Sequence, residues 1–280
     1  MLHPEEHVPP LRLNEALGGL AHPGIDLPEG ACVLAVGREV GDWTGELAQC
    51  YPQHHIVRVQ TSATAVQGVA GTGRKQWANV TYASVQDVLQ LEDTFAPESF
   101  DLICVHFCAS EVPLQQFPAL MQSLLRLCKE QGHVVWLETD LPVTCDDACD
   151  RLAWLLIAAL RARGAMVACL SVPQVGLAAW MEQWLRDAGC NIVQDSFYRA
   201  FVSAGKPLHG LFVQQMHYFS PHLYSFLLHM QVARAQVLDE LFAQARQEMQ
   251  HKDFFAFCSL CRFVCVKPSL WQSRRWWSKR

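Results

Sequence analysis

The stretch that decides the fold is VLAVGREVGDWTGELA, residues 33–48. Its first four residues are apolar and predict a buried strand, Gly37 and Gly41 bracket a tight turn, and the residues that follow have the pattern of a helix. A strand, a glycine-rich turn and a helix in this order form a loop that can hold a nucleotide-like cofactor at the helix N-terminus. Two positions depart from that layout, because Glu39 stands where such loops usually have another glycine and Ala35 where many have an acid.

The rest of the chain extends this strand and helix into an α/β pattern. Apolar runs predict further strands, and amphipathic spacing predicts helices between and after them. The predicted strands are 32–36, 56–59, 80–83, 100–105, 134–137, 191–193 and 254–266, the last of which is one strand or a strand pair. The predicted helices are 44–50, 63–70, 117–128, 152–163 and 180–188. A last helix is expected to start at Ser220-Pro221, with a capping hydroxyl before a first-turn proline, and to run to Met249. Strands that alternate with helices predict a parallel sheet covered on both faces, with ligands at the carboxyl ends of the strands.

Composition bounds the class of protein. The chain has 280 residues, of which 51% are hydrophobic and 18% charged, so a folded core is expected. The formal net charge of -5 argues against a protein that coats nucleic acid. Its 12 cysteines are scattered, which favours small core residues over a metal site. The N-terminus lacks the pattern of a secretory signal and the longest apolar run, 152–160, is too short to span a bilayer, so a cytoplasmic location is predicted.

Six segments in sequence order resemble the motifs of a known family, the class I S-adenosylmethionine-dependent methyltransferases, in particular the group acting on quinones and other small molecules. The similar segments are VLAVGREVGDWTGELA (33–48), IVRVQTSATAV (56–66), VTYASVQDVLQL (80–91), ESFDLICVHF (98–107), LLRLCKEQGHVVWLETD (124–140) and MEQWLRDAGCNIV (181–193). The resemblance covers the chain from about Arg12 to Pro268. It implies a Rossmann-like, mostly parallel seven-stranded sheet whose last strand is antiparallel, with helices added as a cap or lid.

The resemblance also implies a domain organisation. A single methyltransferase-like domain would span 1–280, with an N-terminal cap segment at 1–30 and a cofactor-binding core at 31–140. Lid helices and the last strands would occupy 141–268, and a basic, tryptophan-rich tail 269–280.

The resemblance assigns S-adenosylmethionine as the cofactor and places its binding residues. These are Gly37, Glu39, Gly41, Gln60, Ser84 and Val85. Gln60 stands where the family has an acid that accepts both ribose hydroxyls, and a glutamine can accept one and donate to the other. Ser84 stands at another position that is often acidic and binds the adenine amino group, a role that its hydroxyl and the amide of Val85 can fill.

Methyl transfer needs mainly alignment of donor and acceptor, so few residues are required for the chemistry. His106 follows the fourth predicted strand and is the candidate catalytic residue; the alternative is an ordinary surface histidine. Glu138 to Asp140 end the fifth strand at the same edge of the sheet, where they either line the pocket or begin a polar loop. Aromatic residues near the predicted last helix, from Tyr218 to Phe226, either cover an apolar acceptor or pack between helices.

Two functions therefore remain. The first is transfer of a methyl group from S-adenosylmethionine to a small-molecule acceptor. The second is a methyltransferase fold that no longer transfers methyl and acts as a partner subunit or catalyses a non-methylating reaction. The expected partner is a small-molecule substrate; no nucleic acid is expected as a partner, and no transmembrane segment is expected in the chain. The tail WQSRRWWSKR, 271–280, either binds a membrane surface or a protein, or is a solvated terminus.

Overall fold

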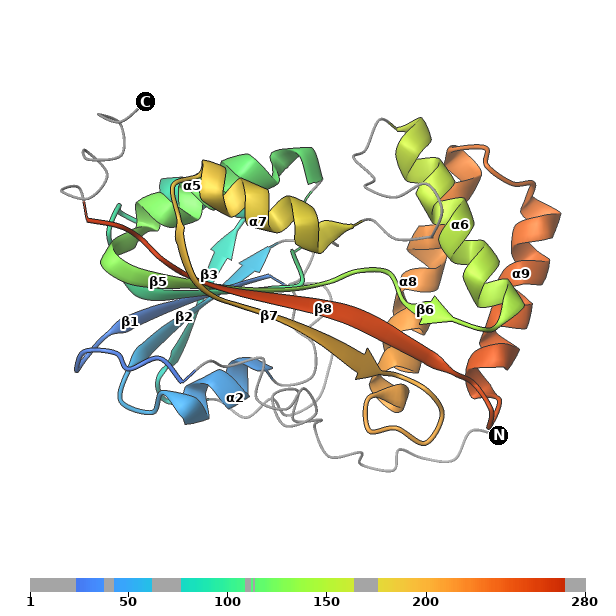
Figure 1. Ribbon diagram of the computed structural model, residues 1–280, viewed down its shortest axis with the longest axis horizontal. Helices are drawn as coiled ribbons and strands as arrows, with labels where there is room; N and C mark the ends of the chain where they lie inside the picture. The colour runs from blue at the N-terminus through green and yellow to red at the C-terminus, as the bar shows by residue number, and fades with distance from the viewer. Residues whose placement is uncertain are drawn as a thin grey trace.

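The computed structural model describes residues 24–37, 43–61, 77–108, 112, 114–163 and 176–269. These residues form a twisted sheet with helices on both of its faces and a group of helices at one end (Figure 1). The strands are β1 (Cys32–Gly37), β2 (His55–Thr61), β3 (Val80–Val85), β4 (Phe100–His106), β5 (Cys128–Thr139), the two-residue β6 (Val143–Thr144), β7 (Asn191–Phe201) and β8 (Ala256–Val266). The alternation of strands and helices predicted from the sequence is confirmed.

The order of the strands is β3-β2-β1-β4-β5-β8-β6, with β7 paired to β8 beside this path. The pairs among the first five strands are parallel, whereas β8 is antiparallel to β5 and to β7. Seven long strands, mostly parallel and ending in an antiparallel one, form the Rossmann-like sheet predicted by the resemblance. The order reverses at β1, whose neighbours are β2 and β4, and ligands of open α/β sheets bind at the carboxyl ends of the strands at such a point.

The central strands are buried because helices cover both faces. The helices are α2 (Trp43–Cys50), α4 (Leu91–Thr94), α5 (Phe117–Leu127), α6 (Asp147–Ala162), α7 (Leu177–Asp187), α8 (His209–His229) and α9 (Ala235–Gln250), with short 3-10 turns at Val88–Gln90 and Leu114–Gln116. In Figure 1, α5 and α7 lie above the sheet and α2 below it. The core between α5, α7 and the sheet contains Trp136, Phe117 and Phe263. The core between α2 and the sheet contains Trp43 and Val33.

Helices α6, α8 and α9 stand together at one end of the molecule (Figure 1). Their facing sides share a separate apolar cluster that includes Leu152 of α6, Leu227 of α8 and Phe242 of α9. The first turn of α6 is fixed to α9, because Glu248 accepts hydrogen bonds from the amides of Ala148 (2.9 Å) and Cys149 (3.0 Å). A carboxylate at a helix N-terminus satisfies free amides and complements the helix dipole.

The prediction for the last helix is wrong in its boundaries. The structure has two helices there, α8 and α9, and Pro221 lies inside α8 rather than at a helix start. A proline cannot donate to the carbonyl four residues earlier, which is that of His217. The hydroxyl of Ser220 donates to that carbonyl instead (3.0 Å), so the helix continues past the proline. The helix predicted at 63–70 lies outside the described residues.

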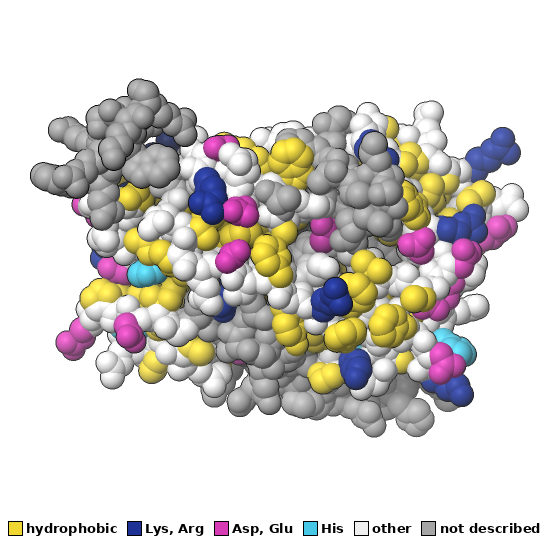
Figure 2. Space-filling model, viewed as in Figure 1, with side chains coloured by type: hydrophobic (Ala, Val, Ile, Leu, Met, Phe, Trp, Pro, Cys, Tyr) yellow, Lys and Arg dark blue, Asp and Glu magenta, His cyan; other side chains and the backbone are white. Residues whose placement is uncertain are grey.

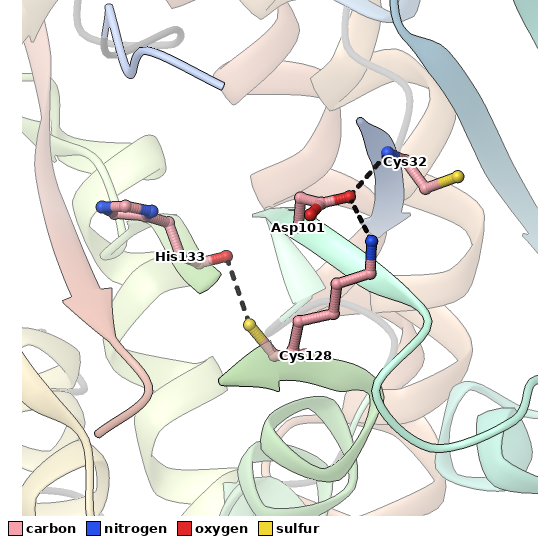
Figure 3. A network of polar contacts seen from close by, with 5 residues as sticks. Cys32, Asp101, Cys128 and His133 are labelled. Atoms are coloured by element: carbon pink, nitrogen blue, oxygen red, sulfur yellow. Dashed lines mark hydrogen bonds and ion pairs between the residues drawn. The ribbon is translucent and has the colours of Figure 1, made fainter. Parts of the chain in front are cut away.

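A polar network joins three strands at the amino-terminal edge of the sheet. The carboxylate of Asp101 on β4 accepts hydrogen bonds from the Cys32 amide on β1 (2.9 Å) and from Lys129 on β5 (2.8 Å), and the Cys128 thiol points to the His133 carbonyl (Figure 3). Burial alone would raise the pKa of Asp101, but the hydrogen bonds from Lys129 and Cys32 hold it below its ordinary value. Asp101 therefore fixes the edge of the sheet opposite the candidate site.

No helix in the described part of the chain combines the length and the apolar character needed to cross a membrane.

Candidate cofactor site

The end of β1 is shaped by Gly37, which is paired in register with His106 at the end of β4. Gly37 has φ +105°, a left-handed backbone that side chains rarely adopt. A β-carbon there would overlap the carbonyl oxygen of His106 and lie 3.0 Å from the Cys108 sulfur. Only glycine fits, and the backbone of β1 thus turns at the edge where cofactors bind in such sheets.

A buried arginine holds this turn from one side of the sheet. Arg58 of β2 is 3% exposed, and its guanidinium donates to the carbonyls of Ala35 (3.2 Å) and Gly37. Both carbonyls belong to the end of β1. Because hydrogen bonds from a charged donor are stronger than neutral ones, Arg58 fixes the position of the glycine turn.

Arg58 is the first member of a stack. Its guanidinium lies over the ring of Trp43, 5.0 Å from the centroid, and Trp43 stacks on His106 with 4.1 Å between ring centroids. Trp43 is the first residue of α2 and is fully buried. The stack joins β2, α2 and β4 directly beneath the glycine turn, and a guanidinium over an indole is a favourable cation–π contact.

The structure corrects one interpretation of His106. This residue is not a surface histidine, because it is fully buried at the end of β4. Its ring lies against Trp43 and, edge-on at 6.1 Å, against Phe107. The catalytic role predicted for it stays a prediction.

The two predicted ribose and adenine residues lie side by side. Gln60 of β2 is the parallel partner of Ser84 of β3, and the next pair is Thr61 with Val85. Gln60 is half-buried and Ser84 exposed, whereas Val85 is buried in the apolar core. Gln60 and Ser84 are thus available at the carboxyl ends of their strands. The other two predicted residues, Glu39 and Gly41, lie outside the described residues.

The polar residues at the end of β5 have different roles. Glu138 is buried, while Asp140 accepts hydrogen bonds from the amides of Gly176 (2.7 Å) and Leu177 (3.1 Å) at the start of α7. Asp140 therefore anchors a helix. It also lines a cavity of about 240 Å³ whose walls include Leu177, Phe197 and Leu260.

Two of the aromatic residues that were expected either to cover an acceptor or to pack between helices do the second. Tyr224 and Phe226 pack within the cluster of α6, α8 and α9. A second cavity of about 190 Å³ is lined by Pro221, Tyr224 and Phe242 among others, and neither cavity includes Gly37 or His106. Within α8, the apolar side chains that pack against the core containing Val33 and Phe107 lie in its first turns and include Leu211 and Phe212.

Sequence reasoning missed Arg58 and Trp43. The signal was present, because a single arginine within the apolar run IVRV of a strand covered on both faces must find buried acceptors. No group of three or more potential metal ligands comes together among the residues that the structure describes. His209, the first residue of α8, has its Nδ1 2.9 Å from the Val202 carbonyl.

Comparison with protein families matches residues 33–132 to the methyltransferase domain. Over these residues the chain matches a methyltransferase domain, which confirms the predicted resemblance to the class I, S-adenosylmethionine-dependent methyltransferases for this segment. A comparison with curated proteins gives no match.

Among solved structures, the chain is similar to phosphoethanolamine N-methyltransferase 2 of Haemonchus contortus in complex with phosphomonomethylethanolamine and S-adenosylhomocysteine. The identity is 16% and the TM-score 0.50, over 93% of this chain and 54% of that one. The YcgJ protein of Bacillus subtilis is similar at 14% identity and a TM-score of 0.49, over 91% of this chain and 99% of that one. The chain thus spans about half the length of the Haemonchus enzyme, and at these identities the likeness defines the fold alone.

Proposed function

We propose that this chain transfers a methyl group from S-adenosylmethionine to a small-molecule acceptor. The observation that carries the proposal is the turn at Gly37, which leaves no room for a side chain at the carboxyl edge of β1, within a domain of the methyltransferase family. Such a turn lets a ligand approach the backbone closely.

The residues present fit this cofactor. Gln60 would accept from one ribose hydroxyl and donate to the other, and Ser84 with the amide of Val85 would meet the adenine. Glu39 and Gly41 complete the proposed binding residues in the loop. When bound, the cofactor supplies an already activated methyl group, so the chain's own task is to align the acceptor and exclude water.

The proposed site binds its cofactor weakly, because Gln60 replaces an acid. A charge-assisted hydrogen bond exceeds a neutral one by about 1–2 kcal/mol, which is roughly ten- to thirtyfold in affinity. Gln60→Glu should therefore tighten binding by that factor. If a folded Gln60→Glu protein binds the cofactor equally or more weakly, Gln60 does not contact the ribose hydroxyls.

In this proposal the first role of His106 is to position the end of β4, and a catalytic role is the alternative. Its ring is buried and stacked on Trp43, so it supports the end of β4 beside Gly37. His106→Asn would separate the two roles in a pH profile of methyl transfer. A catalytic base gives a profile that loses one limb in the variant, while a positioning residue lowers the rate equally at every pH.

The test of the function is calorimetric titration with S-adenosylmethionine and S-adenosylhomocysteine. Gly37→Ala should abolish binding, because the new methyl group overlaps the His106 carbonyl. Gly189→Ala is the matched control: Gly189 also has a left-handed backbone, φ +90°, but open space around it, and it lies in the turn after α7. The control should lose stability and keep its affinity. No binding of either ligand by the wild-type protein would refute the proposal.

A second candidate is a methyltransferase fold that does not methylate. The observation that favours it is Ala35, which is fully buried and stands where the family has an acid, so this position offers no side-chain carboxylate. The Ala35 carbonyl accepts a hydrogen bond from Arg58. Binding of S-adenosylmethionine without consumption of its methyl group across a panel of acceptors would support this candidate.

A further inference from the structure

Strand β7 is a long strand at the border of the sheet. It has 11 residues and pairs with β8, and in the described part of the chain no strand pairs with its other edge. Most of its side chains are exposed, among them Phe197 at 62% and Phe201 at 43%. A long, apolar, open strand edge is a template for another strand, and proteins rarely leave one uncovered.

The direction of the backbone groups on β7 follows from one hydrogen bond. The amide of Val202, just after β7, donates to the carbonyl of Ala256 in β8 (2.9 Å). In an antiparallel pair, alternate residues direct both backbone groups to the same neighbour. From Gln194 to Ala200, where the register with β8 is unbroken, the even-numbered residues therefore bond to β8, and Asp195, Phe197 and Arg199 direct their amides and carbonyls to the open edge.

We propose that a second copy of this chain pairs with this edge, antiparallel to β7, about a two-fold axis at Phe197. In this register Phe197 faces Phe197 of the second copy, and Asp195 faces Arg199 of the second copy, twice by symmetry. Directly opposite residues of an antiparallel pair lie on the same face of the sheet, where opposite charges attract. A two-fold interface of this kind joins the two sheets into one continuous sheet.

Charge selects this register among the alternatives. An axis at Asp195 or at Arg199 would place like charges directly opposite each other, which destabilises a strand pair. An axis at Ser196 or Tyr198 would leave Asp195 opposite an apolar residue. The axis at Phe197 is the one that pairs both charges and also brings the most exposed aromatic side chain of β7 to the centre of the interface.

The side chains around the axis are already ordered by their own chain. Phe197 packs edge-on against Phe263 with 6.1 Å between ring centroids, and the Arg199 guanidinium lies 5.6 Å from the ring centroid of Phe257. Figure 2 shows hydrophobic side chains gathered over the end of β7 and the adjoining part of β8, with basic side chains beside them. Pre-ordered side chains lose less conformational entropy on association.

The experiment is sedimentation velocity of the full chain and of charge-reversed variants. The wild-type protein should sediment as a dimer of the 31.5 kDa chain. Asp195→Arg alone and Arg199→Asp alone each create two like-charge pairs and should weaken self-association at least about tenfold. A mixture of the two variants should form a heterodimer, because every facing pair then has opposite charges.

Glu182→Arg on α7 is the control, since Glu182 is an exposed acid whose partner, Arg186, lies on the same helix. It should leave the dimer unchanged. A monomeric wild-type chain overturns the proposal, and so does a dimer that both single reversals leave intact. Failure of the mixture to restore association, with both variants folded by circular dichroism, refutes the register.

Discussion

Replacement of Arg58 by methionine tests how the glycine turn is held. Arg58 makes two hydrogen bonds to carbonyls of β1 and one cation–π contact with Trp43. Charge-assisted hydrogen bonds contribute about 1.5–3 kcal/mol each and a desolvated cation–π contact about 2 kcal/mol. Hydration of the guanidinium in the unfolded chain offsets several kcal/mol of that sum. The net loss expected for Arg58→Met is therefore about 2–4 kcal/mol in the free energy of unfolding.

The assay is thermal unfolding followed by cofactor titration at a temperature where both proteins are folded. A loss of this size corresponds to a fall in Tm of about 4 to 16 °C for a chain of this length. The Tm of Arg58→Lys should lie between those of the wild type and Arg58→Met, because an ammonium group cannot reproduce the fixed planar arrangement of donors of a guanidinium. Arg151→Met on α6 is the control, since Arg151 is exposed, its ion pair with Asp147 spans 3.7 Å, and its removal should cost under about 0.5 kcal/mol. An Arg58→Met protein with the same Tm and the same cofactor affinity as the wild type would refute this account of the turn.

Three other substitutions test contacts that hold the amino-terminal edge of the sheet and the helices α6, α8 and α9. The lowered pKa of Asp101 means that its carboxylate stabilises the fold above its ordinary pKa, and that this stability is lost as the pH falls through the folded-state value. Asp101→Asn should thus lower the free energy of unfolding at neutral pH, and the difference from the wild type should shrink below about pH 4 in urea titrations; a constant difference down to pH 2 would contradict this. Glu248→Ala removes two amide partners from the start of α6 and should cost about 1–2 kcal/mol by urea unfolding, with Glu240→Ala on the exposed side of α9 as the neutral comparison. Pro221→Ala should raise Tm, because it restores a helical hydrogen bond, and an unchanged or lower Tm would mean that α8 needs its proline.

The sheet was predictable because each central strand is a short, mostly apolar run between turn or helix signals. The segment at 102–105 is one example, because burial on both faces of the sheet favours a continuous apolar run over the alternating pattern of a half-exposed strand. The glycine turn was also predictable, since strand, glycine and helix signals agree there. Gln60 and Ser84, both predicted to bind the cofactor, are partners in the register of β2 and β3, which nothing in the local sequence specified; their binding role stays a prediction.

The errors arose where a local signal competed with packing. Ser220-Pro221 has the pattern of a helix start, yet apolar residues before it, such as Phe212, pack with the sheet core and Leu227 after it packs with α6 and α9. The helix is therefore continuous, and the serine hydroxyl satisfies the carbonyl that the proline leaves. His106 ends a strand, where polar residues are usually exposed, but Trp43 of α2 covers it. The role of Arg58 depends on the β1–β2 register and on the position of α2, neither of which a linear pattern specifies.

The helical pair α8 and α9 has a consequence for how this chain could diversify. Phe201 and Phe257 are direct partners in the sheet, so the chain leaves β7 and enters β8 at a single point. Everything between them is an excursion from neighbouring ends, and with α6 it has its own apolar cluster. The part of this excursion that packs within that cluster, from Leu223 to Ala245, could therefore be lengthened, shortened or exchanged between relatives while the strands that carry Gly37 and Gln60 keep their register. Evolution can vary the part of the molecule beyond the sheet independently of the part that would hold the cofactor.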